Sequence, residues 1–347
     1  MVRHPREVLL GAQAVAGSIP VCDHYSGVEA RMRKSLALQA ELSDEFGACM
    51  FDVTLDCEDG AAVGAERDHA QMVVALARQS RMPRILDGDG TQRPTARIAV
   101  RVHPVDHPAF EQDVQIIVGG AGPALCHLMI PKVESVHDVD RAVAMMDGAA
   151  SGQAARELAL HVLIESPAAV HRAFDIAAHP RVQSMSFGLM DFVSAHAGAI
   201  PAQGMSGPGQ FSNPLVLRAK TEIASACHAH GKVPSHCVVT EFRDRAVVRE
   251  AARKAAREFA YLRMWSIHPD QIRPILEAFA PLESEIDMAS EIILRAQGAD
   301  WAPLDYQGQL HDRASYRFFW QVLERAYRTG QSLAPEVRQY FSAHYRT

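Results

Sequence analysis

The chain has 347 residues, of which 48% are hydrophobic, and it carries a formal net charge of −6. This length and apolar content allow a large core, in one large domain or two smaller ones. The acidic balance provides no basic field for nucleic acid, and no apolar run approaches the about 20 residues that a membrane-spanning helix needs. The six cysteines show no metal-binding spacing, so we interpret them as small buried residues and expect a cytoplasmic protein.

Short apolar segments of strand length alternate with helical segments over about residues 15–282. We expect strands at residues 17–22, 49–57, 96–102, 124–131, 161–165, 182–187, 232–239 and 259–267. Eight such repeats predict an α/β fold of the (β/α)8 TIM-barrel type. A doubly wound open sheet is the alternative. It is disfavoured because acidic or basic residues end the second to sixth strands, as if they converged on one mouth.

The pattern changes after residue 282. A helix is expected at 283–297, and a later helix places Tyr316, Phe319, Val322 and Leu323 on one face. This tail is too small for a core of its own. We therefore expect a barrel domain at 1–282 and a C-terminal helical extension at 283–347, which packs on the barrel or on a neighbouring subunit.

Two carboxylates follow successive strands of the expected barrel. Glu165 ends the fifth strand, and Asp191 follows the sixth after a short loop. Both should lie at the C-terminal edge of the sheet, where two converging acids repel each other unless a cation lies between them. The alternative is that each acid caps the following helix, which is less favoured for two acids on successive strands. Oxygen ligands without His or Cys indicate Mg²⁺, with Mn²⁺ as the alternative.

Arg101 lies near the end of the third expected strand. Its planar guanidinium suits bidentate binding of a substrate carboxylate. A salt bridge to Asp56, Glu58 or Asp59 is the other reading, and the two roles are compatible. Lys132 follows the fourth strand, and its role is open between holding this group of acids in place and a purely structural one.

Six segments occur in one order along the chain and together resemble a known family. They are residues 55–60 (LDCEDG), 100–102 (VRV), 130–134 (IPKVE), 163–166 (LIES), 187–191 (FGLMD) and 266–271 (SIHPDQ). With the terminal segment 308–312 (GQLHD), they are similar to motifs of the citrate lyase beta-subunit and malyl-CoA lyase group of the HpcH/HpaI aldolase superfamily.

The resemblance implies a Mg²⁺-dependent carbon–carbon lyase acting on a 3-hydroxyacyl-CoA of the citryl-CoA or malyl-CoA type. Its reaction partners would be an acyl-CoA thioester and a small 2-oxo acid. Glu165 and Asp191 would ligate the metal, and Arg101 would hold the carboxylate of the 2-oxo acid. Asp312 would match the family's acid–base aspartate, which is delivered into a neighbouring subunit's site in a homo-oligomer, a trimer or hexamer.

The same resemblance places three further residues in the substrate-binding set with Arg101. These are Glu58, Asp59 and Gly188. Departures from the family are found in the first strand, 18–24 (SIPVCDH), which lacks the family's Arg-Ser and Phe-Val-Pro-Gly features, and at His103, where relatives usually carry Asn. Because of these departures, the resemblance does not fix which acyl-CoA is the substrate.

Two alternative functions stay open at this point. One is net hydrolysis, which would give a malate-synthase-like or thioesterase activity. The other is a non-catalytic, ligand-binding relative. The second is disfavoured because a barrel without activity has no need to keep Glu165, Asp191, Arg101 and Asp312 together.

Overall fold

The computed structural model describes residues 4–11, 19–61, 63–80, 95–150, 152 and 157–344. It divides into two compact units, one of residues Val21–Ala278 and the other of residues 1–20 together with 279–347. The first twenty residues therefore group with the C-terminal segment, whereas the sequence placed them with the barrel. Across the described residues, helices fall short of the length and apolar character that crossing a membrane requires.

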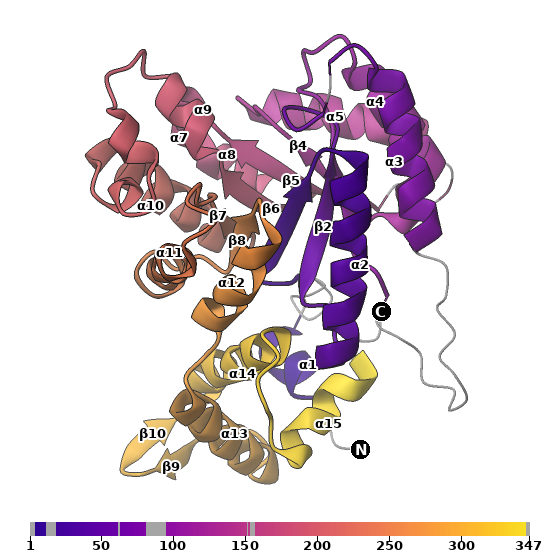
Figure 1. Cartoon of the computed structure of the whole chain (residues 1–347). Coiled ribbons are helices and arrows are strands. Elements are labelled where there is room, and N and C mark those ends of the chain that lie inside the picture. Colours follow the sequence, from indigo (N-terminus) through magenta and orange to yellow (C-terminus); the bar gives the residue numbers. More distant parts are fainter. Residues whose placement is uncertain are drawn as a thin grey trace. The chain divides into compact units, whose positions relative to one another are not determined.

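Eight parallel strands close into a barrel in sequence order, with β1 paired to both β2 and β8 (Figure 1). The strands are β1 (Cys22–Ser26), β2 (Phe51–Asp56), β3 (Ile98–Arg101), β4 (His127–Ile130), β5 (Ala159–Ile164), β6 (Val182–Phe187), β7 (Val233–His236) and β8 (Arg263–Ser266). The predicted (β/α)8 barrel is confirmed.

Helices follow each strand and cover the outside of the barrel (Figure 1). They are α2 (Glu29–Phe46), α3 (Glu66–Ser80), α4 (Phe110–Ala121), α5 (Val136–Ala149), α7 (Pro167–His171), α8 (Ala173–Ala178), α9 (Leu189–Ser194), α10 (Pro214–Ala229), α11 (Arg245–Glu258) and α12 (Ile272–Phe279). The long loop expected at 196–214 contains two 3-10 turns, Ala202–Met205 and Gly209–Phe211. The first strand begins at Cys22, so its expected position at 17–22 was wrong.

The interior of the barrel is layered, because side chains two residues apart on a strand face the same side. Asp23, Asp52 and Arg263 form an ionic layer in the first half of their strands, where the Arg263 Nη2 and Nη1 atoms lie 2.9 Å from Asp23 Oδ2 and 2.7 Å from Asp52 Oδ2. Nearer the C-terminal ends of the strands, buried apolar side chains of β4, β5 and β8 pack together: Met129, Leu163 and Trp265. The strand ends beyond this apolar layer carry the polar side chains of the candidate site.

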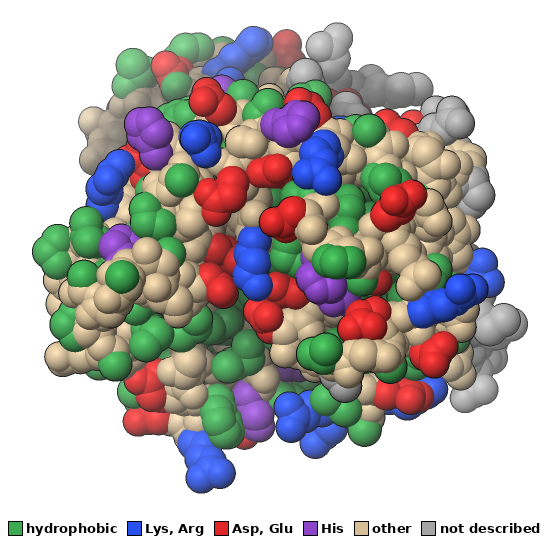
Figure 2. Space-filling view, turned by 90° about the horizontal axis from the view of Figure 1, so that it is seen from above, with side chains coloured by type: hydrophobic (Ala, Val, Ile, Leu, Met, Phe, Trp, Pro, Cys, Tyr) green, Lys and Arg blue, Asp and Glu red, His purple; other side chains and the backbone are tan. Residues whose placement is uncertain are grey.

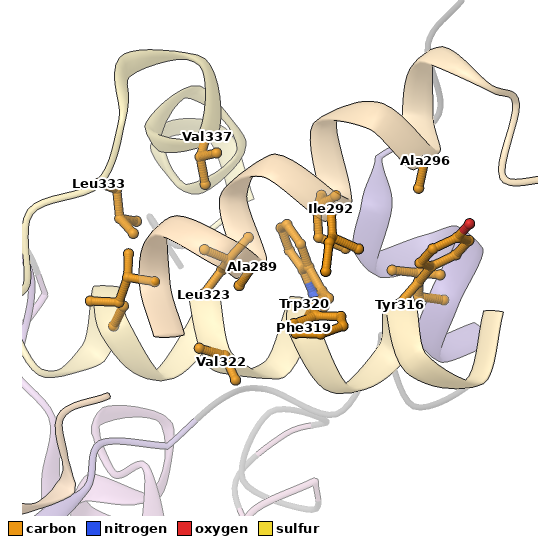
Figure 3. Close-up of a cluster of buried hydrophobic side chains, with 14 of the residues drawn as sticks. Ala289, Ile292, Ala296, Tyr316, Phe319, Trp320, Val322, Leu323, Leu333 and Val337 are labelled. Atoms are coloured by element: carbon orange, nitrogen blue, oxygen red, sulfur yellow. The ribbon is translucent and has the colours of Figure 1, made fainter. Parts of the chain in front are cut away.

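The second unit is built mainly of helices around a core of its own. Its elements are α1 (Pro5–Leu10), α13 (Glu283–Gly298), a hairpin of β9 (Leu304–Tyr306) and β10 (Gln309–His311), α14 (Arg313–Arg328) and α15 (Pro335–His344). Figure 3 shows Tyr316, Trp320 and Leu323 of α14 packed with side chains of α13 and α15. The predicted apolar face of α14 is buried in this core.

A buried ion pair accounts for the place of the N-terminal residues in this unit. Arg6 Nη1 of α1 lies 2.6 Å from Glu324 Oε1 of α14, and Trp320 Nε1 donates to the same oxygen at 2.7 Å. The His4 ring contacts the carbonyl oxygen of Tyr340 at 2.9 Å. Because the Arg6–Glu324 and His4–Tyr340 contacts join positions more than 300 residues apart, helical periodicity alone does not reveal them.

Candidate active site at the barrel mouth

Charged side chains from several strands meet at the C-terminal ends of the barrel strands. Figure 2, which views the molecule from above, shows acidic side chains gathered around basic ones near the centre of this face. Most of these side chains come from the last residue of a strand or from the loop that follows it. This is the edge at which parallel α/β barrels assemble their active sites.

Arg101, at the end of β3, is held by acids from β2 and the loop after it. Its Nε donates to Asp56 Oδ1 at 2.7 Å and its Nη2 to Asp56 Oδ2 at 3.0 Å, while Nη1 lies 2.9 Å from Glu58 Oε2. The expected salt bridge is thus observed, to both acids. Burial alone would lower the pKa of Arg101, but the charge of Asp56, the hydrogen bonds to it and the charge of Glu58 outweigh burial and raise the pKa.

Tyr25, at the end of β1, completes the support of this guanidinium. Its hydroxyl accepts a hydrogen bond from Arg101 Nη2 and donates one to Asp56 Oδ2 at 2.5 Å. The tyrosine ring stacks on Trp265 of β8, with the ring centroids 5.8 Å apart. Tyr25 was not among the predicted site residues, because the expected first strand ended at Cys22, three residues before this side chain.

Lys132 lies just beyond β4 and contacts the same acidic loop. Its Nζ donates to Glu58 Oε1 at 2.6 Å and lies 3.8 Å from Asp59 Oδ1. Burial tends to lower the pKa of Lys132, but the hydrogen bond to Glu58 and the charges of Glu58, Asp59 and Asp191 prevail and raise it. Lys132 therefore carries a positive charge at the mouth throughout the physiological pH range.

Glu165 directly follows β5 and is buried. Its Oε2 atom has no hydrogen-bond partner among the described residues. Burial, and next the charge of Asp191, raise the pKa of Glu165 to about 8. Asp191 is half-buried in the first turn of α9, so both predicted metal ligands follow neighbouring strands, β5 and β6, at the C-terminal edge of the barrel.

The helix-capping alternative for these acids does not match the structure. Ser166 is the N-cap of α7 and accepts a hydrogen bond from the Ala169 amide at 3.0 Å, and Gly188 occupies the N-cap position of α9. Gly188 also leaves room for Glu165, because a Cβ atom at Gly188 would lie 2.3 Å from Glu165 Cγ.

The Glu165 and Asp191 carboxylates fit a divalent metal ion. An ionised Glu165 would leave a buried oxygen without a partner beside a second carboxylate, and a cation between them would remove both costs. Two carboxylates without His or Cys are a donor set that suits Mg²⁺. Their role as ligands stays a prediction.

Asp312 lies in the other unit, at the N-cap of α14. Its Oδ1 accepts hydrogen bonds from the amides of Ala314 at 2.9 Å and Ser315 at 3.4 Å, and the side chain is exposed. These local contacts give Asp312 a helix-capping role. The acid–base role implied by its motif is compatible with that exposure and stays a prediction.

Comparisons with known proteins agree on the family. A model of the HpcH/HpaI aldolase/citrate lyase family matches residues 36–260. The L-malyl-CoA/beta-methylmalyl-CoA lyase of Cereibacter sphaeroides is 31% identical over 240 residues, which cover 63% of this chain and 73% of that protein. The citrate lyase subunit beta of Haemophilus influenzae is 27% identical over 297 residues, covering 83% and 92% of the two chains.

Solved structures extend the likeness to nearly the whole chain. A citrate lyase from Burkholderia xenovorans LB400 is 45% identical with a TM-score of 0.76, covering 98% of this chain and 100% of its own. The Mycobacterium tuberculosis protein CitE, in complex with magnesium, acetoacetate and coenzyme A, shares the fold at 20% identity and a TM-score of 0.61, over 89% and 98% of the two chains. The chain belongs to the HpcH/HpaI aldolase/citrate lyase family, and it is an enzyme of the lyase class.

Proposed function

We propose that this enzyme is a Mg²⁺-dependent carbon–carbon lyase that cleaves or forms a 3-hydroxyacyl-CoA of the malyl-CoA or citryl-CoA type. The products of cleavage are a 2-oxo acid and the enolate of an acyl-CoA. The observation that carries this proposal is the buried Glu165 carboxylate at the barrel mouth, whose Oε2 has no hydrogen-bond partner among the described residues and whose pKa is raised by burial and by the charge of Asp191. The names of the relatives and the magnesium in the CitE complex support it.

Each group at the mouth has a task in that reaction. Arg101 holds the carboxylate of the 2-oxo acid, and its contacts with Asp56 and Tyr25 keep the guanidinium in one orientation. When bound, Mg²⁺ would polarise the carbonyl group of the 2-oxo acid. The enolate formed at the thioester requires fixed positive charge or hydrogen-bond donors, and an acid–base group must transfer its proton.

The reaction class is tested by incubating the protein with malyl-CoA, methylmalyl-CoA and citramalyl-CoA, with Mg²⁺ or with a chelator. We expect release of a 2-oxo acid from at least one thioester, and only when Mg²⁺ is present. Free thiol is followed in parallel. Thiol release without a 2-oxo acid would instead indicate hydrolysis of the thioester, and release that continues in the chelator would contradict the metal requirement.

Asp312→Asn is expected to lower turnover by at least about 100-fold, because proton transfer by a positioned side chain contributes that much in general acid–base catalysis. Mg²⁺ affinity should not change. Asparagine is also a good N-cap, so α14 should stay folded, and circular dichroism serves as the control. Normal turnover of this variant would exclude the acid–base role.

We also infer that Asp312 acts in the site of a neighbouring subunit of a homo-oligomer, as part of the C-terminal extension. Mixing an inactive Asp312→Asn variant with an inactive Glu165→Gln variant should then restore part of the activity, because some mixed sites contain both intact residues. If subunit exchange is demonstrated and no activity returns, the shared site is excluded.

Gly188→Ala should weaken Mg²⁺ binding without unfolding the barrel. The added Cβ would lie 2.3 Å from Glu165 Cγ and would push that carboxylate out of place. Gly148→Ala in α5 is the control, because a Cβ there meets nothing within 4 Å. Calorimetric titration with Mg²⁺ measures the effect, and equal affinities in the two variants would contradict the proposed placement of Glu165.

A further inference from the structure

We propose that Lys132 is a second binding group for the substrate carboxylate and shares it with Arg101. This inference rests on the proposed function and deepens it. The notable feature is that one protein carboxylate, Glu58, already bridges the two cations: Oε2 lies 2.9 Å from Arg101 Nη1, and Oε1 accepts from Lys132 Nζ at 2.6 Å.

Arg101 does not have enough free donors to hold a carboxylate alone. Its Nε and both N–H groups of Nη2 are directed to Asp56 and Tyr25. Nη1 lies 2.9 Å from Glu58 Oε2 without forming a hydrogen bond to it, so among the described residues Nη1 is the one nitrogen of this guanidinium whose donors are not engaged. A bidentate contact uses donors on two nitrogens, so the second oxygen of a substrate carboxylate requires another donor.

Lys132 has the donors that Arg101 lacks. An ammonium group carries three N–H donors, and Glu58 takes one of them, while the Asp59 carboxylate at 3.8 Å is beyond hydrogen-bond distance. The side chain is 38% exposed, so the ammonium can be reached from the mouth. Lys132 lies just beyond β4 and Glu165 directly follows β5, the neighbouring strand, so both residues lie at the same edge of the barrel.

The backbone at Lys132 also indicates a functional constraint. This residue has a φ of 52°, in the left-handed region that is unfavourable for residues other than glycine. Such strain persists where the surrounding structure fixes it, and it is concentrated at functional sites. Pro131 immediately before it fixes the direction in which the chain leaves β4.

The spacing of the two cations follows from their shared contact. Because the two oxygens of Glu58 each meet one cation, the cations are separated by a distance that a single carboxylate can bridge. A substrate carboxylate can bridge them in the same way, with one oxygen on Arg101 Nη1 and the other on the partly exposed Lys132 Nζ. The ligand class is therefore the carboxylate of a 2-oxo acid.

The test compares Lys132→Met and Lys132→Arg with the wild type, using glyoxylate and pyruvate as probes in the presence of Mg²⁺. Binding is measured by calorimetry, and the KM values for the 2-oxo acid and the acyl-CoA are measured in the condensation direction. Lys254→Met is the matched control, because Lys254 has similar exposure, 32%, and a comparable glutamate neighbour, Glu250, on the outer helix α11.

In Lys132→Met we expect the affinity for the 2-oxo acid to fall by about tenfold or more, the loss typical of one charged hydrogen bond. The KM for the acyl-CoA and the affinity for Mg²⁺ should stay within about twofold, and Lys132→Arg should recover most of the binding. Lys254→Met should match the wild type. Affinity within twofold of the wild type in Lys132→Met overturns the proposal.

A purely structural role, in which Lys132 acts only by fixing Glu58, predicts a different result. Glu58→Gln would then cause the same loss, and Lys132→Met in the Glu58→Gln background would cause no further loss. If Lys132 binds the carboxylate directly, the double variant binds the 2-oxo acid more weakly than Glu58→Gln alone. A wild type that binds Mg²⁺ but neither probe contradicts the proposed function itself, and the Lys132 proposal with it.

Discussion

Glu165→Gln is expected to abolish Mg²⁺ binding and turnover while making the metal-free protein more stable at alkaline pH. Glutamine has nearly the same shape as glutamate, so the packing around α7 and α9 should not change. It lacks the charge that a divalent ion requires from a ligand. The substitution lowers Mg²⁺ affinity but raises the stability of the metal-free protein, because the ionised carboxylate binds the metal and is destabilising when no metal is bound.

The sign of the pH effect follows from the pKa of Glu165. Burial and Asp191 raise it to about 8, from an ordinary value of 4.5. Between these two values the unfolded chain has released the proton that the folded chain still holds, so the stability of the metal-free protein falls as the pH rises. The loss is complete above the folded pKa and amounts to several kcal/mol, at about 1.4 kcal/mol for each pH unit. Glu165→Gln removes this dependence.

The measurement is thermal or denaturant unfolding at pH 5 and pH 8, with Mg²⁺ or with a chelator. In the chelator, the stability advantage of Glu165→Gln over the wild type should be larger at pH 8 than at pH 5. Mg²⁺ should stabilise the wild type and leave the variant unchanged. Glu277→Gln, at an exposed ion pair with Arg249, is the control. Unchanged Mg²⁺ affinity in Glu165→Gln would exclude Glu165 as a ligand.

The sequence predicted the barrel because its strands are apolar on the outward face, against the helices. The order of the strands follows from the strand–helix repeat, and the sixth strand was predicted at residues 182–187, the range that the structure shows. The acids at strand ends were found for the same reason, since an abrupt change from apolar to charged residues marks the barrel mouth. Glu165 and Asp191 required only this local signal.

The prediction failed for the first strand, which ends in polar and charged residues. Asp23 and His24 belong to β1 and are buried, but in the sequence they resemble the end of a strand. This error also hid Tyr25. Which partners these side chains find depends on barrel closure, which brings β8 beside β1 across more than 200 residues of chain. The grouping of α1 with α14 is likewise a tertiary contact without a periodic signal.

Removing Arg263 should destabilise the barrel by about 3–5 kcal/mol, the usual cost of leaving a buried charge without its partner. Arg263 is fully buried between the Asp23 and Asp52 carboxylates. Asp52 keeps a second partner in Arg97, whose Nε lies 2.6 Å from Asp52 Oδ1. Asp23 has no other guanidinium partner among the described residues. In Arg263→Met it is therefore the carboxylate that stays buried without a compensating positive charge.

This ionic layer needs no metal ion, although Asp23, His127 and His161 place possible ligand atoms within 4.8 Å of one another. Burial lowers the pKa of both histidines, so they are neutral, and two carboxylates face two guanidinium groups. A divalent ion would add uncompensated charge to a buried site. Arg263, rather than a metal ion, therefore neutralises the carboxylates of this layer.

The pH dependence and a second substitution distinguish this explanation from a simple loss of packing. Burial already raises the pKa of Asp23, with Arg263 opposing the shift, so in Arg263→Met the pKa rises further. The folded variant then holds a proton that its unfolded chain releases above about pH 4. The loss of unfolding free energy relative to the wild type should therefore grow from pH 5 to pH 8.

Adding Asp23→Asn to Arg263→Met should recover part of the lost stability, because the uncompensated charge is gone. Arg245→Met, at an exposed pair 3.4 Å from Asp270, should cost less than about 1 kcal/mol. If the loss of stability in Arg263→Met does not depend on pH and Asp23→Asn does not reduce it, Arg263 stabilises the barrel by packing rather than by its charge.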